Sequence, residues 1–316
     1  MKKYVIRRVF TGIITVIIVF ALNFMLIKTA PGDPITTLMG KDNDSPEMRQ
    51  ALEEKYGLDK PLPVQFVSYL KTAVKGDLGT SIIYNRPVTK MISEKVGATV
   101  LLGLTAALLA ALIGTFMGIY AARNEGGAFD IVSSGTSYAF NSMPNFWLGL
   151  MLIIIFSSNL GILPSYGMTD TRAGYTGIQH VLDIAKHMIL PVATLTLVLI
   201  PQYFRIAKSS VLQVTNEDFI TTFRATGMSE KKIFRNAILP TVTIFGISMA
   251  YLITGVTLIE IVFAWPGMGR LVMTAINQRD YPTLMGIYLI MSISVAVVML
   301  IVDIVYAMLD PRIRYE

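Results

Sequence analysis

A chain of 316 residues with 53% apolar and 15% charged residues has too few charges for an ordinary water-soluble domain. The mean hydropathy is +0.58, and several apolar runs reach the ~20 residues needed to cross ~30 Å of hydrocarbon, which indicates a membrane protein. A net charge of +6 is typical of loops facing anionic lipid rather than of nucleic-acid binding, and the lack of cysteine excludes disulfides, thiolate nucleophiles and iron–sulfur clusters.

The N-terminal region combines a basic segment with a long apolar run. Lys2, Lys3, Arg7 and Arg8 precede the apolar residues 9–27. The run is long for a secretory signal and no A-x-A-like cleavage site follows it, so we predict that residues 1–27 form a tail and an uncleaved first membrane helix. Residues 28–96 are polar and rich in turns, and they predict a small subdomain of short helices outside the membrane.

The second predicted span, residues 97–122, carries a stripe of small residues at four-residue spacing. Such a stripe lets another helix approach closely. Packing is the favoured interpretation, and no further role is assigned to the stripe. Its members are Ala106, Ala110, Gly114, Gly118 and Ala122.

The third predicted span, residues 129–157, is unusually polar in its first half and contains Pro144. Polar groups at membrane depth need partners or a water-filled cavity. We favour a helix that lines a pathway and breaks near Pro144, with Asn141 and Ser142 as candidate contacts. The alternative is hydrogen bonding between neighbouring helices.

The remaining chain adds an external loop and three spans. The loop covers residues 159–186, and because His180 and His187 form no HExxH pattern, no metal site is predicted. The spans are predicted at residues 187–209, 241–264 and 283–309. Residues 97–316 thus form the membrane core, with a charged loop at 210–240.

Charge predicts which way the six spans are oriented. Six spans put both termini on one side, where the segments near the membrane hold thirteen Lys and Arg residues, against four in the short loops opposite. The long first loop is left out because long segments translocate largely regardless of charge. Both termini and the 210–240 loop are therefore predicted to be cytoplasmic.

Several chemistries find no support in the sequence. No G-x-x-x-x-G-K-[ST] phosphate loop is present, so the chain has no such motif for binding ATP. We take Glu260 and Asp303 as the only acidic residues of the spans, both toward span ends, whereas an ion-driven carrier more often keeps ionisable groups near the midplane. Glu260 is interpreted either as an interfacial anchor or as part of the outer mouth of a pathway.

The charged segment 218–240 predicts two short helices separated by Gly227. Asn216 can cap the first helix, Phe219 and Phe223 share its apolar face, and Gly227 can end it in a left-handed conformation. Ser229 can cap the second helix, and Pro240 marks a change of direction. A short amphipathic element of this kind at a membrane surface is typical of a docking site.

The segment TTFRATG at 221–227, followed by Pro240, resembles the EAA loop of ABC importer permeases. Further motifs resemble the dipeptide/oligopeptide (and nickel) branch and occur in that branch's order: APGDP at 30–34, YGLDKPL at 56–62, GDLGTS at 76–81, HMILP at 187–191, FAWPGMGR at 263–270, RDYP at 279–282 and LDPRIR at 309–314. The chain departs from the pattern in lacking the acidic EAA residue. It is also about five residues, more than one helical turn, shorter between Lys232 and Pro240.

The resemblance implies an all-α, six-helix type I permease in a bacterial cell membrane that is not itself an enzyme. A similar second permease, two ATPase subunits that bind ATP and Mg²⁺, and an external solute-binding protein that delivers peptide would be its partners. This chain would bind no cofactor and would contact lipid. The implied ATPase-coupling residues are Phe223, Arg224, Ala225, Thr226, Gly227, Met228, Ser229 and Glu230.

Two further groups of residues are expected along the transport route. The pathway candidates are Asn141, Ser142, Pro144, Thr254, Thr257 and Glu260. The outer-gate candidates are Trp265, Pro266, Gly267, Arg279 and Asp280. The alternative for the second group is that Trp265 is an interfacial anchor and Pro266, Gly267 and Gly269 form a tight re-entry turn. Alternatives for the whole chain are a permease for nickel or another small solute, an ion-coupled secondary carrier, and a membrane scaffold or enzyme.

Overall fold

The computed structural model describes residues 2–29, 45–56, 59–215 and 256–309. These residues are helical apart from turns, loops and one isolated bridge between Thr80 and Pro87. The predicted coupling segment, and all of the predicted fifth span except its last nine residues, lie outside the described residues.

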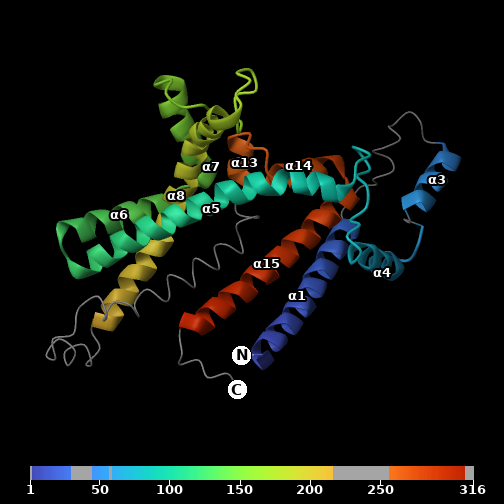
Figure 1. The fold of residues 1–316 in the computed structure, drawn as a ribbon, viewed down its shortest axis with the longest axis horizontal. Helices are drawn as coiled ribbons and strands as arrows, with labels where there is room; N and C mark the ends of the chain where they lie inside the picture. The colour runs from blue at the N-terminus through green and yellow to red at the C-terminus, as the bar shows by residue number, and fades with distance from the viewer. Residues whose placement is uncertain (1, 30–44, 57–58, 216–255, 310–316) are drawn as a thin grey trace. The chain divides into compact units, whose positions relative to one another are not determined.

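Eleven helical elements occur in the described residues (Figure 1). In chain order they are α1 (Lys2–Thr29), α3 (Pro46–Tyr56), α4 (Leu62–Ala73), α5 (Val88–Arg123), α6 (Ala128–Ser142), α7 (Asn145–Leu152), the π-helix η1 (Ile153–Asn159), α8 (Gly177–Thr215), α13 (Thr257–Val262), α14 (Met268–Gln278) and α15 (Tyr281–Leu309).

Four of these helices, α1, α5, α8 and α15, are long and apolar enough to cross a membrane. The pair α6 and α7–η1 passes the same test but bends by 104°, giving up to five spans in the described part of the chain. The first, second, fourth and sixth predicted spans thus each correspond to a long helix. Short helices α3 and α4 fall in the polar region 28–96, as predicted.

The fourth span begins earlier than predicted. Helix α8 starts at Gly177, so the second part of the predicted 159–186 loop is helical, and both His180 and His187 lie on α8. At 1.5 Å per residue its 39 residues extend over about 58 Å, well beyond the ~30 Å of hydrocarbon. The charged first turns of α8 therefore have room to stand outside the apolar layer.

The break near Pro144 is confirmed. Met143 has extended backbone angles, as expected for a residue before proline, because the proline ring disfavours the helical region there. Pro144 is also extended and precedes α7, where its missing N–H costs no helical hydrogen bond.

The small-residue stripe on α5 is a close packing face. A Cβ atom at Gly118 would lie 2.5 Å from the backbone oxygen of Phe204, and one at Gly114 would lie 2.8 Å from the Cβ atom of Tyr203. Both neighbours belong to α8, so α5 and α8 approach at backbone distance. The prediction that the stripe serves helix packing is confirmed.

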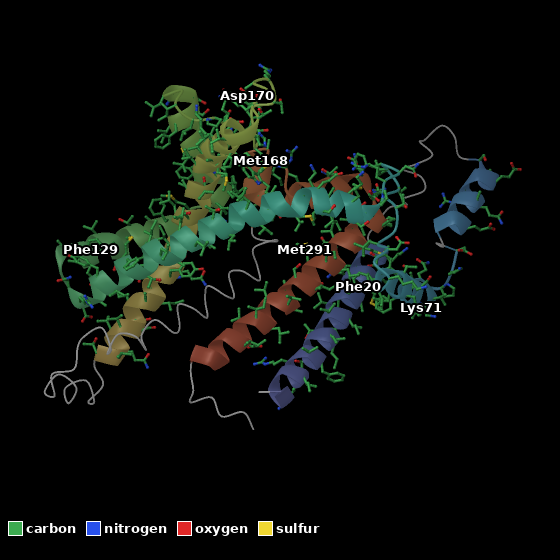
Figure 2. All side chains as sticks on the ribbon, in the orientation of Figure 1. Phe20, Lys71, Phe129, Met168, Asp170 and Met291 are labelled. Atoms are coloured by element: carbon green, nitrogen blue, oxygen red, sulfur yellow. The ribbon has the colours of Figure 1, made fainter. Side chains whose placement is uncertain are left out.

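The described chain forms two compact units. The first contains residues 99–215, 256–266 and 298–309, and the second contains residues 2–29, 45–56, 59–98 and 267–297. In the second unit Phe20 of α1, which is labelled in Figure 2, stacks on Phe66 and Tyr69 of α4, with ring centroids 5.8 and 5.4 Å apart. Burial, with a smaller contribution from Asp77, raises the pKa of Tyr69, which stays neutral at physiological pH.

Candidate functional site

A buried carboxylate joins two sequence motifs that are about 200 residues apart along the chain. Asp280, from RDYP, is 1% exposed and accepts hydrogen bonds from the Ser81 hydroxyl at 2.5 Å, the Ile82 N–H at 3.1 Å and the Thr283 hydroxyl at 2.7 Å. Ser81 closes GDLGTS. The carboxylate of Asp280, predicted at the outer gate, is thus engaged inside the second unit, where it anchors the 76–87 loop.

The GDLGTS loop is shaped to present Ser81. Gly79 has φ of +86°, a conformation that side chains rarely adopt, and its N–H donates to Asp77 Oδ1 at 2.8 Å. Ser81 then donates its backbone N–H to the Arg86 oxygen at 2.9 Å. These local bonds fix the loop in a shape that presents Ser81 and Ile82 to Asp280.

The outer-gate candidates Trp265, Pro266 and Gly267 follow helix α13. Helix α13 ends at Val262, Ala264 in the following turn has a φ of +48°, and the Trp265 N–H donates to the Glu260 oxygen at 2.8 Å. Trp265 is fully buried, so the interfacial-anchor interpretation is wrong. The re-entry-turn interpretation is wrong for Gly269, which lies within α14; Pro266 and Gly267 form the connection between α13 and α14. Arg279, with φ of +54°, ends α14.

Glu260 is also fully buried, in α13. Its carboxylate accepts a hydrogen bond from the Thr99 hydroxyl of α5 at 2.6 Å. The interpretation of Glu260 as an anchor exposed to the membrane interface is therefore wrong. In this conformation it ties α13 to α5, and its role at a pathway stays a prediction.

An acidic residue missed by the sequence analysis is buried in the third span. Asp130, in the first turn of α6, accepts hydrogen bonds from the Gly126 N–H at 3.1 Å and the Ser134 hydroxyl at 3.2 Å. It also forms an ion pair with Lys208 of α8, and the two side chains are 8% and 22% exposed. The prediction that Glu260 and Asp303 are the only acidic residues of the spans is wrong.

The pathway candidates are placed only in part. Asn141, Ser142 and Pro144 are exposed at the break between α6 and α7, and the Ser142 hydroxyl donates to the Tyr138 oxygen at 2.9 Å within its own helix. Thr257 is half-buried at the start of α13. Thr254 and the coupling residues Phe223–Glu230 lie outside the described residues, so their roles stay predictions.

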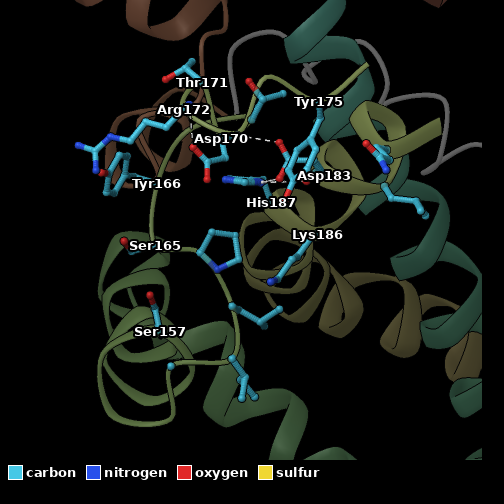
Figure 3. A pocket seen from close by; sticks show the side chains of 17 residues that line it. Ser157, Ser165, Tyr166, Asp170, Thr171, Arg172, Tyr175, Asp183, Lys186 and His187 are labelled. Carbon is cyan, nitrogen blue, oxygen red and sulfur yellow. Dashed lines mark hydrogen bonds and ion pairs between the residues drawn. The ribbon is translucent and has the colours of Figure 1, made fainter. Parts of the chain in front are cut away.

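A cavity of about 730 Å³ opens beside the first turns of α8 (Figure 3). Most of its wall comes from the loop between η1 and α8, with the remainder from α8 and from Ser157 of η1. Its polar and aromatic lining residues include Tyr166, Asp170, Arg172, Tyr175, Gln179, Asp183, Lys186 and His187.

Buried polar groups hold this cavity in shape. Asp183, which is 9% exposed, accepts the backbone N–H of Asp170 at 2.7 Å, and His187 Nδ1 lies 3.2 Å from its other carboxylate oxygen. A second tie joins the Gly167 N–H to the Phe263 oxygen at 2.8 Å. The loop is thereby fixed both to α8 and to the end of α13. Within the described ranges, no group of three His, Asp or Glu residues is arranged to hold a metal ion.

The sequence is similar to known membrane transport components along its whole length. Residues 114–315 match the family described as "Binding-protein-dependent transport system inner membrane component", and residues 1–105 match the corresponding N-terminal family. The chain belongs to this family.

Three relatives align with this inner membrane component over the full length of both chains. The oligopeptide transport system permease protein of Bacillus subtilis (strain 168) is 37% identical over 321 residues. The dipeptide transport system permease protein of Escherichia coli (strain K12) is 33% identical over 338 residues, and the glutathione transport system permease protein of Salmonella choleraesuis (strain SC-B67) is 35% identical over 321 residues.

Membership in this family confirms the resemblance drawn from the motifs, and the structure gives several of the motifs a physical role. GDLGTS and RDYP meet at Asp280, while HMILP begins with His187, the partner of Asp183. The cavity could not be predicted from the sequence because most of its lining lies in a loop without periodicity. One local signal was present, the spacing of four between Asp183 and His187, which puts them on one helix face.

Proposed function

We propose that this inner membrane component is the permease subunit of an ATP-driven importer of di- and oligopeptides in a bacterial cell membrane. The observation that carries the proposal is the similarity, over the whole of both chains, to permeases named for oligopeptides, dipeptides and glutathione. Glutathione is itself a peptide, so the three names share one substrate class. The relatives give no support to nickel as the substrate.

The proposed assembly contains a second, similar permease, two ATPase subunits and an external solute-binding protein. The sequence has no phosphate loop, so ATP and Mg²⁺ bind to the partner ATPases and this chain is not catalytic. The chain has six membrane helices in a type I permease fold, the fifth at residues 241–264. Both termini are cytoplasmic, and residues 28–96 and the loop after η1 are external.

Residues Phe223–Glu230 form the contact with an ATPase subunit. Helix α8 ends at Thr215, residues 216–222 separate it from this segment, and the ion pair between Lys208 and Asp130 ties α8 to α6. Helix α6 leads to the break at Pro144, beside the pathway candidates Asn141 and Ser142. Movement of the segment on ATP binding would thus reach the pathway through α8 and α6.

The coupling role of Gly227 has a direct test. Proline lacks the N–H and the left-handed freedom that Gly227 is predicted to need, so Gly227→Pro should abolish peptide uptake while the assembly still forms. Gly135→Ala on α6, where no atom lies within 4 Å of the added Cβ, is the matched control. Full peptide uptake and peptide-dependent ATP hydrolysis by Gly227→Pro would contradict the coupling assignment.

The proposed substrate is tested by uptake in cells. A strain lacking this gene should lose uptake of labelled di- and oligopeptides and regain it with the wild-type gene, while labelled nickel uptake stays unchanged. Loss and recovery of nickel uptake, with peptide uptake unaffected, would favour the second substrate class and contradict the first.

A further inference from the structure

The cavity beside α8 exposes charges of both signs without pairing them to one another. Lys186 and Arg172 are exposed and line the cavity, and neither forms an ion pair with any described residue. Asp170 Oδ1 accepts the backbone N–H of Arg172 at 2.9 Å, whereas its Oδ2 accepts no hydrogen bond within the described part of the chain. One carboxylate oxygen and two cations therefore remain available to a bound molecule.

The cavity is built before any ligand arrives. The carboxylate of Asp183 is already engaged by the Asp170 N–H and by His187, whose side chain is 9% exposed. In Figure 3 these groups form one side of the cavity, and the amine of Lys186 extends toward the same space. A preformed site binds with a smaller loss of conformational entropy than a loop that must first be ordered.

The arrangement of charges favours a zwitterion. A carboxylate suits Lys186, an ammonium group suits Asp170, and the rings of Tyr166 and Tyr175 offer surface to apolar side chains. A volume of about 730 Å³ is within the range of small-molecule sites. An extended tripeptide is about 10 Å long, so its two termini can reach separate groups in one such cavity.

We propose that this cavity binds a free peptide by its two termini, with Lys186 holding the carboxylate and Asp170 holding the ammonium group. The proposal rests on the proposed function, in which the loop is external and receives peptide. All linear peptides share these termini whatever their side chains. Recognition of the termini therefore gives a transporter affinity for peptides of many sequences.

The experiment measures peptide affinity in the absence of the solute-binding protein. The purified permease–ATPase assembly in nanodiscs is titrated with radiolabelled trialanine, N-acetylated trialanine and trialanine amide by equilibrium dialysis. Lys186→Gln should weaken trialanine binding about tenfold, the size expected for loss of a charge-assisted bond, and should leave binding of the amide unchanged. Asp170→Asn should weaken trialanine binding similarly and leave binding of the acetylated peptide unchanged.

Two control variants separate this effect from misfolding. Lys186→Arg keeps the cation and should stay within about threefold of the wild-type affinity. Arg205→Gln removes an exposed cation of the same helix outside the cavity and should leave the affinity unchanged. Equal losses for Lys186→Gln, Lys186→Arg and Arg205→Gln would overturn the site.

Other outcomes also overturn the proposal. Equal affinity for free and capped trialanine would show that the termini are not read. If Lys186→Gln weakened binding of the purified solute-binding protein and left trialanine binding unchanged, the cavity would be a contact site for that protein and not a peptide site. A wild-type assembly that imports peptide yet binds none alone would overturn the site and leave the proposed function intact. An assembly that imports no peptide would overturn the proposed function itself.

Discussion

The ion pair between Lys208 of α8 and Asp130 of α6 holds two helices together. Their ion pair is mostly withdrawn from solvent, at 22% and 8% side-chain exposure. Removing one partner of a buried pair typically costs about 3–5 kcal/mol, because the remaining charge is left without compensation. We predict that Lys208→Met lowers the free energy of unfolding by about 3 kcal/mol, measured by denaturation in detergent, whereas Arg205→Gln changes it little.

The double variant Lys208→Met with Asp130→Asn completes this test. Because it removes both charges, it should recover part of the stability lost in Lys208→Met. If the two substitutions added without recovery, the two side chains would be acting independently, contrary to the contact in the structure.

Asp280 is the second residue on which a local structure depends. Asparagine would replace one of the two carboxylate oxygens with an NH₂ group, so that either the Ile82 N–H or the hydroxyls of Ser81 and Thr283 would lose their acceptor. We predict that Asp280→Asn lowers the free energy of unfolding by about 1–3 kcal/mol and speeds proteolysis within residues 76–87. The matched control, Asp59→Asn, replaces an exposed carboxylate and should behave as wild type. Equal protease sensitivity of the two variants would argue against the anchor role.

At the scale of helices, α5 and α8 can approach closely because glycine has no Cβ atom. A Cβ at position 118 would lie 2.5 Å from the Phe204 oxygen and 2.8 Å from the Ala207 Cβ, so the helices must separate to admit it. Gly118→Ala should therefore destabilise the assembly by about 1–3 kcal/mol, the usual cost of overpacking. Gly135→Ala should be neutral or stabilising, since alanine favours helix and the site is open. A thermal unfolding scan of both variants checks the prediction, and equal midpoints would contradict it.

Local sequence patterns predicted those features of the helices that depend on a single residue type. Small residues spaced by four predicted the packing face of α5, and Pro144 predicted the bend between α6 and α7. The start of α8 was not predicted, because the Gly, Pro and Tyr residues of 159–186 are typical of a loop. In the structure Asp183 and His187 pair along the helix, which lets charged residues occupy its first turns. Asp130 is visible in the predicted span 129–157, but its pairing with Lys208, 78 residues away, is beyond any local pattern.

At the scale of the whole molecule, spaced motifs identified the family before their physical roles were visible. The sequence could not show that GDLGTS and RDYP share the carboxylate of Asp280, or that Phe263 and Asp183 fix the same loop. These relations depend on contacts between segments that are far apart in the chain. The candidate cavity was unpredictable for the same reason, since its walls meet only when the loop after η1 folds against α8.

If this chain forms part of an ATP-driven peptide importer, the reconstituted assembly must transport peptide at the expense of ATP. The permease pair, the ATPases and the solute-binding protein are placed in proteoliposomes, and uptake of a labelled peptide is measured with and without ATP. We predict uptake that requires ATP, the ATPases and the binding protein, and that is unaffected when ion gradients are collapsed. Peptide uptake driven by an ion gradient without ATP would contradict the account.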